Sequence, residues 1–518
     1  RIANKKTAAL GGALFYLFNL TTIQMFYTPL EAFSVHFAAL PWLAWSLLAY
    51  LKGGSHRHLL AFFMIAFLAT PQFFIPTLLL PVGILLAALS IASLGKPTTI
   101  IIKRITVAAM GFLLVNAFWL LPYLYGLPRN APVIQEAKIN QMSSDEVFAR
   151  NQAFGGLSDV LRLRGFPLDF EDVGANGESI YLMAPWRVFL TQPVVALGSW
   201  TLVTLTLIGL LVIGTNRLVV GFAISFFVGL VFLGSDTPIL KDIFEWLRTT
   251  LPFFAEGYRF PFTKFSILFA LSSTVLLTAG LVHLSDMIKK FSRTVSVLLL
   301  LTILGLTVAL PYPALSGHFF SDRLQVTLPD DYQQLFTLMH NKPIGRVAYL
   351  PQQQYWSWKY YRWGYRGSGF IWYGLPQPLL DRAFDPWSEK NENYYWELSR
   401  ALYSKDAAAV DSVLAKYDVR YVLLDESIIS PSSDRGLFIG ETKELLTQMP
   451  EIKEIARFGT LTLFENWIPG QARDDKSRKS FVSLKSNLPT VSPSYKWTDN
   501  DVAYARIGDY IATGEPST

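Results

Sequence analysis

The feature that most constrains the fold of this chain is a series of apolar stretches, each long enough to cross a bilayer as a helix, which takes about 20 residues. We predict nine of them: 8–27, 32–51, 59–76, 77–94, 105–125, 193–213, 218–234, 263–283 and 294–311. The third and fourth meet near Pro71 and Pro76, so they could also form one broken or re-entrant element. The chain is therefore predicted to be a polytopic α-helical membrane protein.

The composition supports this class and excludes several functions. Only 16% of the residues are charged and 51% are hydrophobic, whereas a typical soluble protein has about 25% charged residues. The net charge of +6 does not indicate nucleic-acid binding, because the Lys and Arg residues are scattered and several flank apolar stretches. The absence of cysteine excludes disulfides and thiolate chemistry. The six histidines form no spaced ligand set, so only carboxylates and water could hold a divalent cation.

Basic residues at alternate connections predict how the helices are oriented. Five places that fall on one side of the nine-span arrangement carry Lys or Arg, whereas the short connections on the other side, 28–31 and 71–76, carry neither. Because cytoplasmic loops are enriched in Lys and Arg, we expect a multi-pass protein of the plasma (inner) membrane with its N-terminus in the cytoplasm. The basic positions are Arg1, Lys5 and Lys6 before the first stretch, Lys52 and Arg57 after the second, Lys96, Lys103 and Arg104 after the fourth, Arg217 after the sixth, and Lys289, Lys290 and Arg293 after the eighth.

This orientation places three longer segments outside the cytoplasm. In the loop 126–192, Ser143 and Glu146 match a capping box that opens an amphipathic helix on the membrane surface. The loop 235–262 is expected to lie along the membrane interface and to lead into the eighth stretch. Its apolar residues at helical spacing are Ile239, Leu240, Ile243, Phe244 and Leu247.

The chain after residue 312 has the pattern of a soluble α/β domain. PDDYQQLFTLMHN and DAAAVDSVLAKYD predict helices, GRVAYLP and VRYVLLD predict buried strands, and IKEIARFGTLTLFEN predicts a hairpin turning near Gly459. We therefore divide the chain into a membrane core at 1–312, an extracytoplasmic α/β domain at 313–466, and a polar tail or the start of a further domain at 467–518.

Six further stretches are informative as a set: AALGGALFYLFNLTTIQMFYTPLEAFSVHFAALPWL, VNAFWLLPYL, PFFAEGYRFPFTKF, LPDDYQQLF, GRVAYLP and VRYVLLD. Together they resemble, in order, the GT-C superfamily of membrane glycosyltransferases, and most nearly its α-(1→3)-arabinofuranosyltransferase-type members. The FRxP-like element at 258–261 is the most specific part of this resemblance. Since the chain begins at Arg1 rather than Met, we expect it to be N-terminally truncated.

The resemblance implies transfer of a sugar from a polyprenyl-phosphate donor to an extracytoplasmic cell-envelope glycan or lipid acceptor. It also implies a catalytic carboxylate in the first outer loop, where Glu31 is the only acid. Alternatively, the true first span and its loop precede Arg1, and Glu31 is an interfacial carboxylate at the start of a helix. Asp236 is a second candidate acid or divalent-metal ligand, or else an N-cap.

Cations at the outer end of the eighth stretch suit a lipid phosphate. We expect Arg259 to bind the donor phosphate, Lys264 to assist as a point charge and Tyr258 to supply a hydroxyl. The alternative is that both cations extend toward lipid headgroups, or that Arg259 pairs with Glu256.

An aromatic run at 352–374 is a candidate binding surface for the acceptor glycan, because flat aromatic faces suit sugar rings. It could equally rest on the membrane or pack beneath the α/β domain. The candidate residues are Trp356, Trp358, Trp363 and Trp372.

A rival function is that of a non-catalytic membrane protein in cell-envelope glycan assembly or lipid-glycan transport. A transporter is expected to show inverted repeats and charges in the middle of its spans. The sequence shows neither feature.

Overall fold

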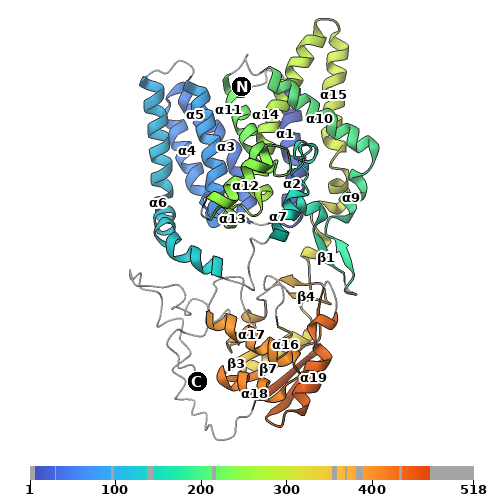
Figure 1. Cartoon of the computed structure of the whole chain (residues 1–518). Helices are drawn as coiled ribbons and strands as arrows, with labels where there is room; N and C mark the ends of the chain where they lie inside the picture. The colour runs from blue at the N-terminus through green and yellow to red at the C-terminus, as the bar shows by residue number, and fades with distance from the viewer. Residues whose placement is uncertain are drawn as a thin grey trace. The chain divides into compact units, whose positions relative to one another are not determined.

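The computed structural model describes residues 6–29, 31–94, 99–136, 145–174, 176–212, 217–251, 253–352, 359–367, 370–380, 389–430 and 434–466 (Figure 1). The chain forms two compact units. The helical unit comprises Arg1–Tyr123, Ser143–Phe170 and Tyr181–Leu324, and the α/β unit comprises Leu124–Met142, Glu171–Ile180 and Gln325–Thr518.

The apolar stretches fold as helices where the sequence predicts them, but two of these helices are short. Among the described residues, seven helical segments are long and apolar enough to cross a membrane: Lys6–Tyr27, Glu31–Gly53, Pro76–Leu94, Thr99–Pro128, Pro193–Leu211, Pro261–Lys289 and Arg293–His318. The third and seventh predicted spans correspond to the shorter apolar helices His56–Leu68 and Val219–Leu233. In the part of the chain that the structure describes, the nine predicted stretches therefore correspond to seven long helices and two shorter ones.

The third predicted span is short because the chain breaks before Pro71. Helix α4 (His56–Leu68) has 13 residues, a length of about 20 Å, whereas the hydrocarbon core is about 30 Å thick. The 3₁₀ helices η1 (Thr70–Phe74) and η2 (Pro76–Leu78) follow before α5 (Leu79–Leu94). A broken element around Pro71 and Pro76, one of the two predicted alternatives, is the one observed.

The first predicted span is also interrupted, at Asn19. Helix α1 (Lys6–Phe18) ends there and α2 (Leu20–Tyr27) begins. The Asn19 amide accepts a hydrogen bond from the Thr22 backbone N–H at 3.1 Å and donates one to the Tyr16 carbonyl at 2.8 Å. This side chain replaces helix bonds that the break removes, which permits the interruption inside an apolar segment.

Helix α14 (Pro261–Lys289) is the centre of the helical unit (Figure 1). In its most apolar 18-residue window, 89% of the residues are buried. A Cβ atom on Gly280 of α14 would lie 2.1 Å from the Leu205 carbonyl oxygen of α10 (Pro193–Leu211), and one on Gly209 would lie 1.9 Å from the Leu276 carbonyl oxygen. Reciprocal glycines therefore let the two helix backbones approach closely.

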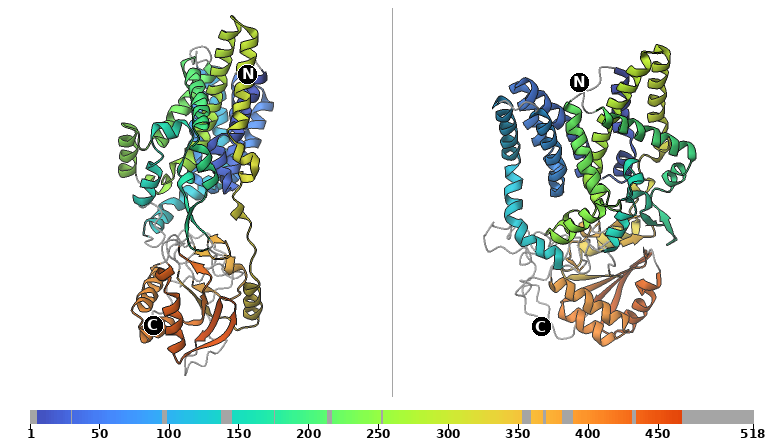
Figure 2. Two further views of the ribbon diagram at one scale, coloured as in Figure 1. Left: turned by 90° about the vertical axis from the view of Figure 1, so that its right-hand side faces the viewer. Right: turned by 45° about the horizontal axis from the view of Figure 1, so that its top comes forward.

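Many of the other helices of this unit pack against α14. In the left view of Figure 2, the helices run mostly along one direction, and the turn between α14 and α15 lies near one end. An Arg104 guanidinium nitrogen of α6 donates to the Leu51 carbonyl of α3 at 2.8 Å. The other helices are α3 (Glu31–Gly53), α6 (Thr99–Glu136), α7 (Asp145–Gln152), α8 (Leu157–Leu161), α9 (Ala184–Leu190), α11 (Arg217–Leu233), α12 (Leu240–Thr250), α13 (Phe254–Gly257) and α15 (Arg293–Ala309).

The amphipathic helix predicted after Ser143 is two short helices in the structure. Ser143 itself lies outside the described residues, and α7 and α8 are separated at Gly155 and Gly156. The Gly155 carbonyl accepts hydrogen bonds from the Asp236 N–H at 3.2 Å and from the Thr237 hydroxyl at 3.0 Å. The break therefore docks this segment against the turn between α11 and α12, which the sequence pattern does not reveal.

The α/β unit contains the elements predicted for it. A five-stranded mixed sheet has the order β6-β3-β7-β10-β9, in which β3 is parallel to β6 and β7, and β10 is antiparallel to β7 and β9. Its strands are β3 (Arg346–Leu350), β6 (Leu379–Leu380), β7 (Val419–Asp425), β9 (Ile452–Phe458) and β10 (Leu461–Asn466). Smaller sheets pair β1 (Glu171–Val173) with β2 (Ser179–Tyr181), and β4 (Lys359–Tyr361) with β5 (Arg366–Gly367) and β8 (Ile428–Ile429).

Side chains that alternate along the strands cover both faces of the five-stranded sheet. On one face, Ala348 and Leu350 pack with α17 (Glu389–Tyr403), α18 (Ala407–Lys416) and α19 (Ile439–Gln448). On the other face, Val347 and Tyr349 pack with α16 (Asp330–His340) and with the aromatic residues around β4. The hairpin predicted at Gly459 joins β9 to β10, and Gly459 has a φ of 52°.

The contact between α10 and α14 leads to a test by a matched pair of glycine substitutions. Gly280→Ala places a methyl group against a backbone carbonyl, so we expect it to destabilise the chain by about 1–3 kcal/mol and to lower its melting temperature in detergent. Gly305→Ala in α15 meets no atom within 4 Å and should leave the melting temperature unchanged or raise it slightly. Equal effects of the two substitutions would contradict the close helix contact.

Candidate functional site

The candidate site in the helical unit lies where the chain turns into α14. Pro261 occupies the first turn of α14, a position that proline favours. Before it, Phe254 of α13 is buried, and its ring centroid lies 5.0 Å from that of Tyr258. The Tyr258 ring also lies 5.7 Å from Phe265 of α14. These aromatic contacts hold the segment that carries Arg259.

Arg259 is fixed by neighbours on its own segment and by α7. One guanidinium nitrogen donates to the Glu256 carbonyl at 2.7 Å and lies 3.9 Å from the Glu256 carboxylate. The Arg259 carbonyl accepts from the Asn151 side-chain amide at 3.0 Å. The Arg259 side chain keeps 26% of its surface exposed. The predicted alternative of pairing with Glu256 is thus observed, in an arrangement that leaves part of the guanidinium accessible.

Lys264 lies one turn into α14, close enough to Arg259 for the two positive charges to interact. Its ammonium group donates to the Thr263 hydroxyl at 2.9 Å and lies 5.5 Å from the centre of the Phe33 ring. Among the residues that the structure describes, no carboxylate is within ion-pair distance of Lys264. Two cations therefore lie close together in the chain, and the Glu256 carboxylate lies beside one of them, Arg259.

Tyr258 completes this group as a hydrogen-bond donor. Burial raises the pKa of the Tyr258 hydroxyl to about 12, with a smaller contribution from Tyr123. The hydroxyl therefore remains protonated at neutral pH and is available to donate to an anion.

The two candidate acids lie on different elements. Glu31 is the first residue of α3 and is exposed, two residues before Phe33, which contacts Lys264. Glu31 therefore begins the helix whose Phe33 ring contacts Lys264. Asp236 lies in the turn before α12, where its carboxylate pairs with Lys241 at 3.2 Å. The N-cap of α12 is Ile239, so Asp236 does not have the capping role weighed for it.

A small polar cavity of about 20 Å³ adjoins the first turns of α14, and the sequence gives no sign of it. Five buried polar groups on residues that line it have no hydrogen-bond partner among the described residues: the hydroxyls of Thr21, Ser235 and Ser266, the side-chain oxygen of Asn151 and the Nε of Arg164. A polar cavity of this size is large enough for one water molecule. Asn151 connects this cavity to the carbonyl of Arg259.

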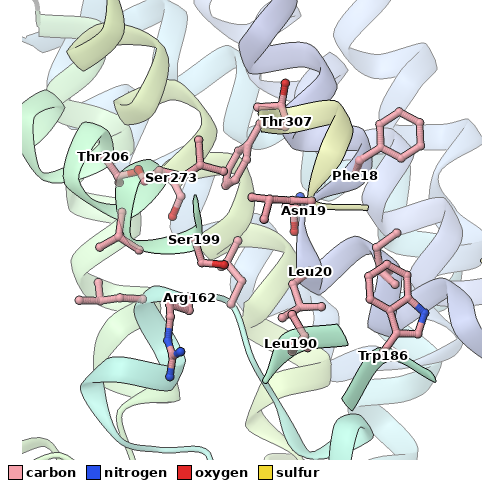
Figure 3. Close-up of a pocket in the computed structure, with 17 residues that line it drawn as sticks. Phe18, Asn19, Leu20, Arg162, Trp186, Leu190, Ser199, Thr206, Ser273 and Thr307 are labelled. Atoms are coloured by element: carbon pink, nitrogen blue, oxygen red, sulfur yellow. The ribbon is translucent and has the colours of Figure 1, made fainter. Parts of the chain in front are cut away.

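A larger cavity of about 60 Å³ lies beside the break at Asn19 (Figure 3). Its lining is mostly apolar, and the hydroxyls of Ser199, Thr206 and Thr307 donate to carbonyls of their own helices. Arg162 also lines it, and its guanidinium pairs with Asp159 at 3.2 Å. Because these polar groups already have partners, we assign this cavity no catalytic role.

The aromatic run of the α/β unit forms a packed cluster. The Trp363 indole N–H donates to the Tyr332 hydroxyl at 3.4 Å, and its ring stacks on Tyr365 with centroids 5.5 Å apart. Trp372 is half-buried in the 3₁₀ helix η8 (Phe370–Tyr373), next to Tyr373, which is 83% exposed. The other two candidate tryptophans, Trp356 and Trp358, lie outside the described residues.

Beneath this cluster lies a buried carboxylate that the sequence analysis missed. Asp425, at the end of β7, is 0% exposed. One of its oxygens accepts from the hydroxyls of Tyr332 at 2.6 Å and Tyr349 at 2.7 Å, and the other accepts from the Ser427 hydroxyl at 2.6 Å and N–H at 2.9 Å. The only available signal was an acid that ends an apolar strand, which does not identify its partners.

The described residues contain no group of three or more His, Asp or Glu side chains that could hold a metal ion. Any divalent cation in this part of the chain would therefore need ligands from water or from a substrate.

The helices and the α/β unit together define a polytopic membrane protein with a small mixed-sheet domain. No protein-family model and no curated protein matches the sequence. The fold is similar to that of the arabinofuranosyltransferase AftD from Mycobacteria, solved by single-particle cryo-EM, with a TM-score of 0.61 and 10% identity over 90% of this chain. A structure of a point mutant of AftD matches with a TM-score of 0.58 and 11% identity, again over 90% of this chain. The chain covers 32% and 33% of those two chains, about a third of their length.

The buried Asp425 leads to a pH-dependence test. Burial raises the pKa of Asp425, and its hydrogen bonds offset this only in part. The folded chain then binds this proton more tightly than the unfolded chain, so the stabilisation is present below the ordinary aspartate pKa and is lost as the pH rises through the raised pKa. We expect the melting temperature of the wild type relative to Asp425→Asn to fall over that range.

The matched control for this test is Asp406→Asn. Asp406 caps α18 and accepts from the Ala409 N–H at 3.0 Å, and asparagine caps helices about as well as aspartate. A difference between wild type and Asp425→Asn that does not change with pH would show that the pKa of Asp425 is not raised.

Proposed function

We propose that the chain is part of an integral-membrane glycosyltransferase of cell-envelope synthesis, which moves a sugar from a polyprenyl-phosphate donor to an extracytoplasmic glycan or lipid acceptor. The fold likeness to an arabinofuranosyltransferase supports the class. The proposal for the donor is carried by one observation, the adjacent cations Arg259 and Lys264 at the start of α14, with no carboxylate in ion-pair range of Lys264 among the described residues.

Electrostatics favours an anionic ligand at this position. A partly buried charge is costly unless it is paired, and charges at the edge of a membrane are often functional. Glu256 offsets Arg259 in part, at 3.9 Å. A phosphate would offset both cations, with Arg259 donating from its guanidinium, Lys264 acting as a point charge and the Tyr258 hydroxyl donating a third hydrogen bond.

The proposed reaction needs few protein groups. The acceptor hydroxyl oxygen bonds to the anomeric carbon of the donor sugar while the bond from that carbon to the phosphate oxygen breaks. The polyprenyl phosphate leaves with the bonding electron pair, and a carboxylate takes the proton of the acceptor hydroxyl. Glu31 is our first candidate for this base because it begins the helix whose Phe33 contacts Lys264, and Asp236 is the second.

The α/β unit is proposed to bind the acceptor. Trp363 and Trp372 would offer aromatic faces to sugar rings, together with Trp356 and Trp358 from the same run. A divalent cation could accompany the donor phosphate, with water completing its ligands.

Substitution of Arg259 tests donor binding. Hydrogen bonds to charged groups contribute about 1.5–3 kcal/mol, so Arg259→Ala should weaken binding of polyprenyl phosphate by about tenfold to a hundredfold. Lys264→Gln should act in the same direction, and Tyr258→Phe should have a smaller effect. Binding is measured by titrating the lipid phosphate into the purified chain in nanodiscs.

Arg457→Ala is the control for this test, because Arg457 is a cation of the α/β unit that pairs with Glu454 at 2.7 Å. Its affinity for the lipid phosphate should equal that of the wild type. If Arg259→Ala loses activity while its affinity for polyprenyl phosphate is unchanged, the phosphate-binding role is wrong. Binding without any sugar transfer by the complete protein would favour the non-catalytic alternative.

The proposed orientation can be tested separately, because the chain contains no cysteine. A single cysteine in place of Phe291, which is 90% exposed in the turn between α14 and α15, should be protected from an impermeant maleimide added to intact cells. A single cysteine in place of Tyr373 in the α/β unit should be labelled. The reverse labelling pattern would contradict the proposed sidedness.

A further inference from the structure

Helix α12 has three distinct faces, although the sequence shows a single group of apolar residues. Leu240, Phe244 and Leu247 form an inner stripe with spacings of four and three residues. Phe244 is 3% exposed and packs with Phe148 and Phe254, and Leu247 lies against the same cluster. The inner stripe therefore attaches α12 to the rest of the helical unit.

A second apolar stripe runs beside the first with the same spacing. This outer stripe consists of Ile239, Ile243 and Trp246, which are 74%, 39% and 57% exposed. Leu251 and Phe253 continue the exposed apolar surface after the helix ends. Helical spacing alone does not separate the two isoleucines from Phe244, which is buried, and the predicted apolar group leaves out Trp246.

The third face of α12 is charged, and its ions are largely paired. Lys241 pairs with Asp236 at 3.2 Å, and Arg248 pairs with Glu245 at 2.9 Å and with Asp145 at 3.1 Å. The outer stripe thus lies between a face packed on protein and a face suited to water. This arrangement of apolar and charged faces is that of a helix lying in the plane of a membrane interface.

The place of α12 in the chain favours lipid as the occupant of the outer stripe. The apolar helix α11 ends at Leu233, a few residues before α12, and α14, which is long enough to span a membrane, begins at Pro261. Both connections hold α12 close to helix ends, and in the left view of Figure 2 the green helix α12 stands at one edge of the helical unit. Tryptophan is also enriched at membrane–water interfaces.

We propose that the outer stripe of α12 inserts into the boundary between the headgroups and the acyl chains of the bilayer. This contact would hold Arg259, which follows α12 by a short connection, at the depth of lipid phosphates. Only the statement about the depth of Arg259 rests on the proposed function. The insertion itself is independent of any activity.

The cysteine-free chain permits a direct test by spin labelling. Nitroxides are attached to Ile243→Cys and Trp246→Cys on the outer stripe and to Asp242→Cys and Thr249→Cys, two exposed positions away from it. Each full-length variant is reconstituted in vesicles of phosphatidylcholine and phosphatidylglycerol. Power saturation then measures collision with oxygen, which concentrates in lipid, and with a nickel chelate, which remains in water.

We expect the two outer-stripe labels to collide severalfold more with oxygen than with the nickel chelate, relative to the two controls. Equal ratios at all four positions would show that the stripe faces water and would overturn the proposal. Low collision with both reagents at positions 243 and 246 would also overturn it, because it would show that protein rather than lipid covers the stripe. Since no sugar transfer is measured, failure here is distinguishable from failure of the proposed function.

Discussion

The packing of one helix, α14, determines the rest of the helical unit. Its apolar window is 89% buried, and glycines at 209 and 280 bring its backbone against that of α10. In a lipid environment, close van der Waals packing of this kind is a main force that holds helices together, because burial of apolar surface gains little there. A helix so enclosed is a rigid support. Its first turn therefore holds Lys264 and the preceding Arg259 in a fixed relation.

Much of this fold could be predicted because its signals are local. Apolar stretches and the hairpin at Gly459 each depend on a few adjacent residues, and the structure has helices or strands at those places. The length of α4 and the break at Asn19 could not be predicted, because apolar content does not report where a helix ends. The break at Asn19 depends on the side-chain amide of this residue, whose hydrogen bonds replace backbone hydrogen bonds of the helix.

The candidate site shows the same limit. The cations near Pro261 stand out in the sequence because they interrupt an apolar pattern, but the contacts of Arg259 with Asn151 and of Lys264 with Phe33 join residues far apart in the chain. Asp425 is a stronger example, since its partners Tyr332 and Tyr349 come from a helix and another strand. The fold is similar to that of AftD at only 10% identity. Such a low identity is compatible with a similar fold, because many different apolar sequences can form the same arrangement of helices.

The two apolar stripes of α12 differ in how strongly their surroundings restrict the shape of each side chain. Phe244 has to fit a cavity shaped by Phe148 and Phe254, so a residue of another shape there leaves a void or a clash. In the proposed membrane contact, Ile243 and Trp246 would instead meet acyl chains, which rearrange around any apolar shape. Over evolutionary time the inner stripe is therefore restricted in shape, whereas the outer stripe can drift among apolar residues, and only a charge is selected against.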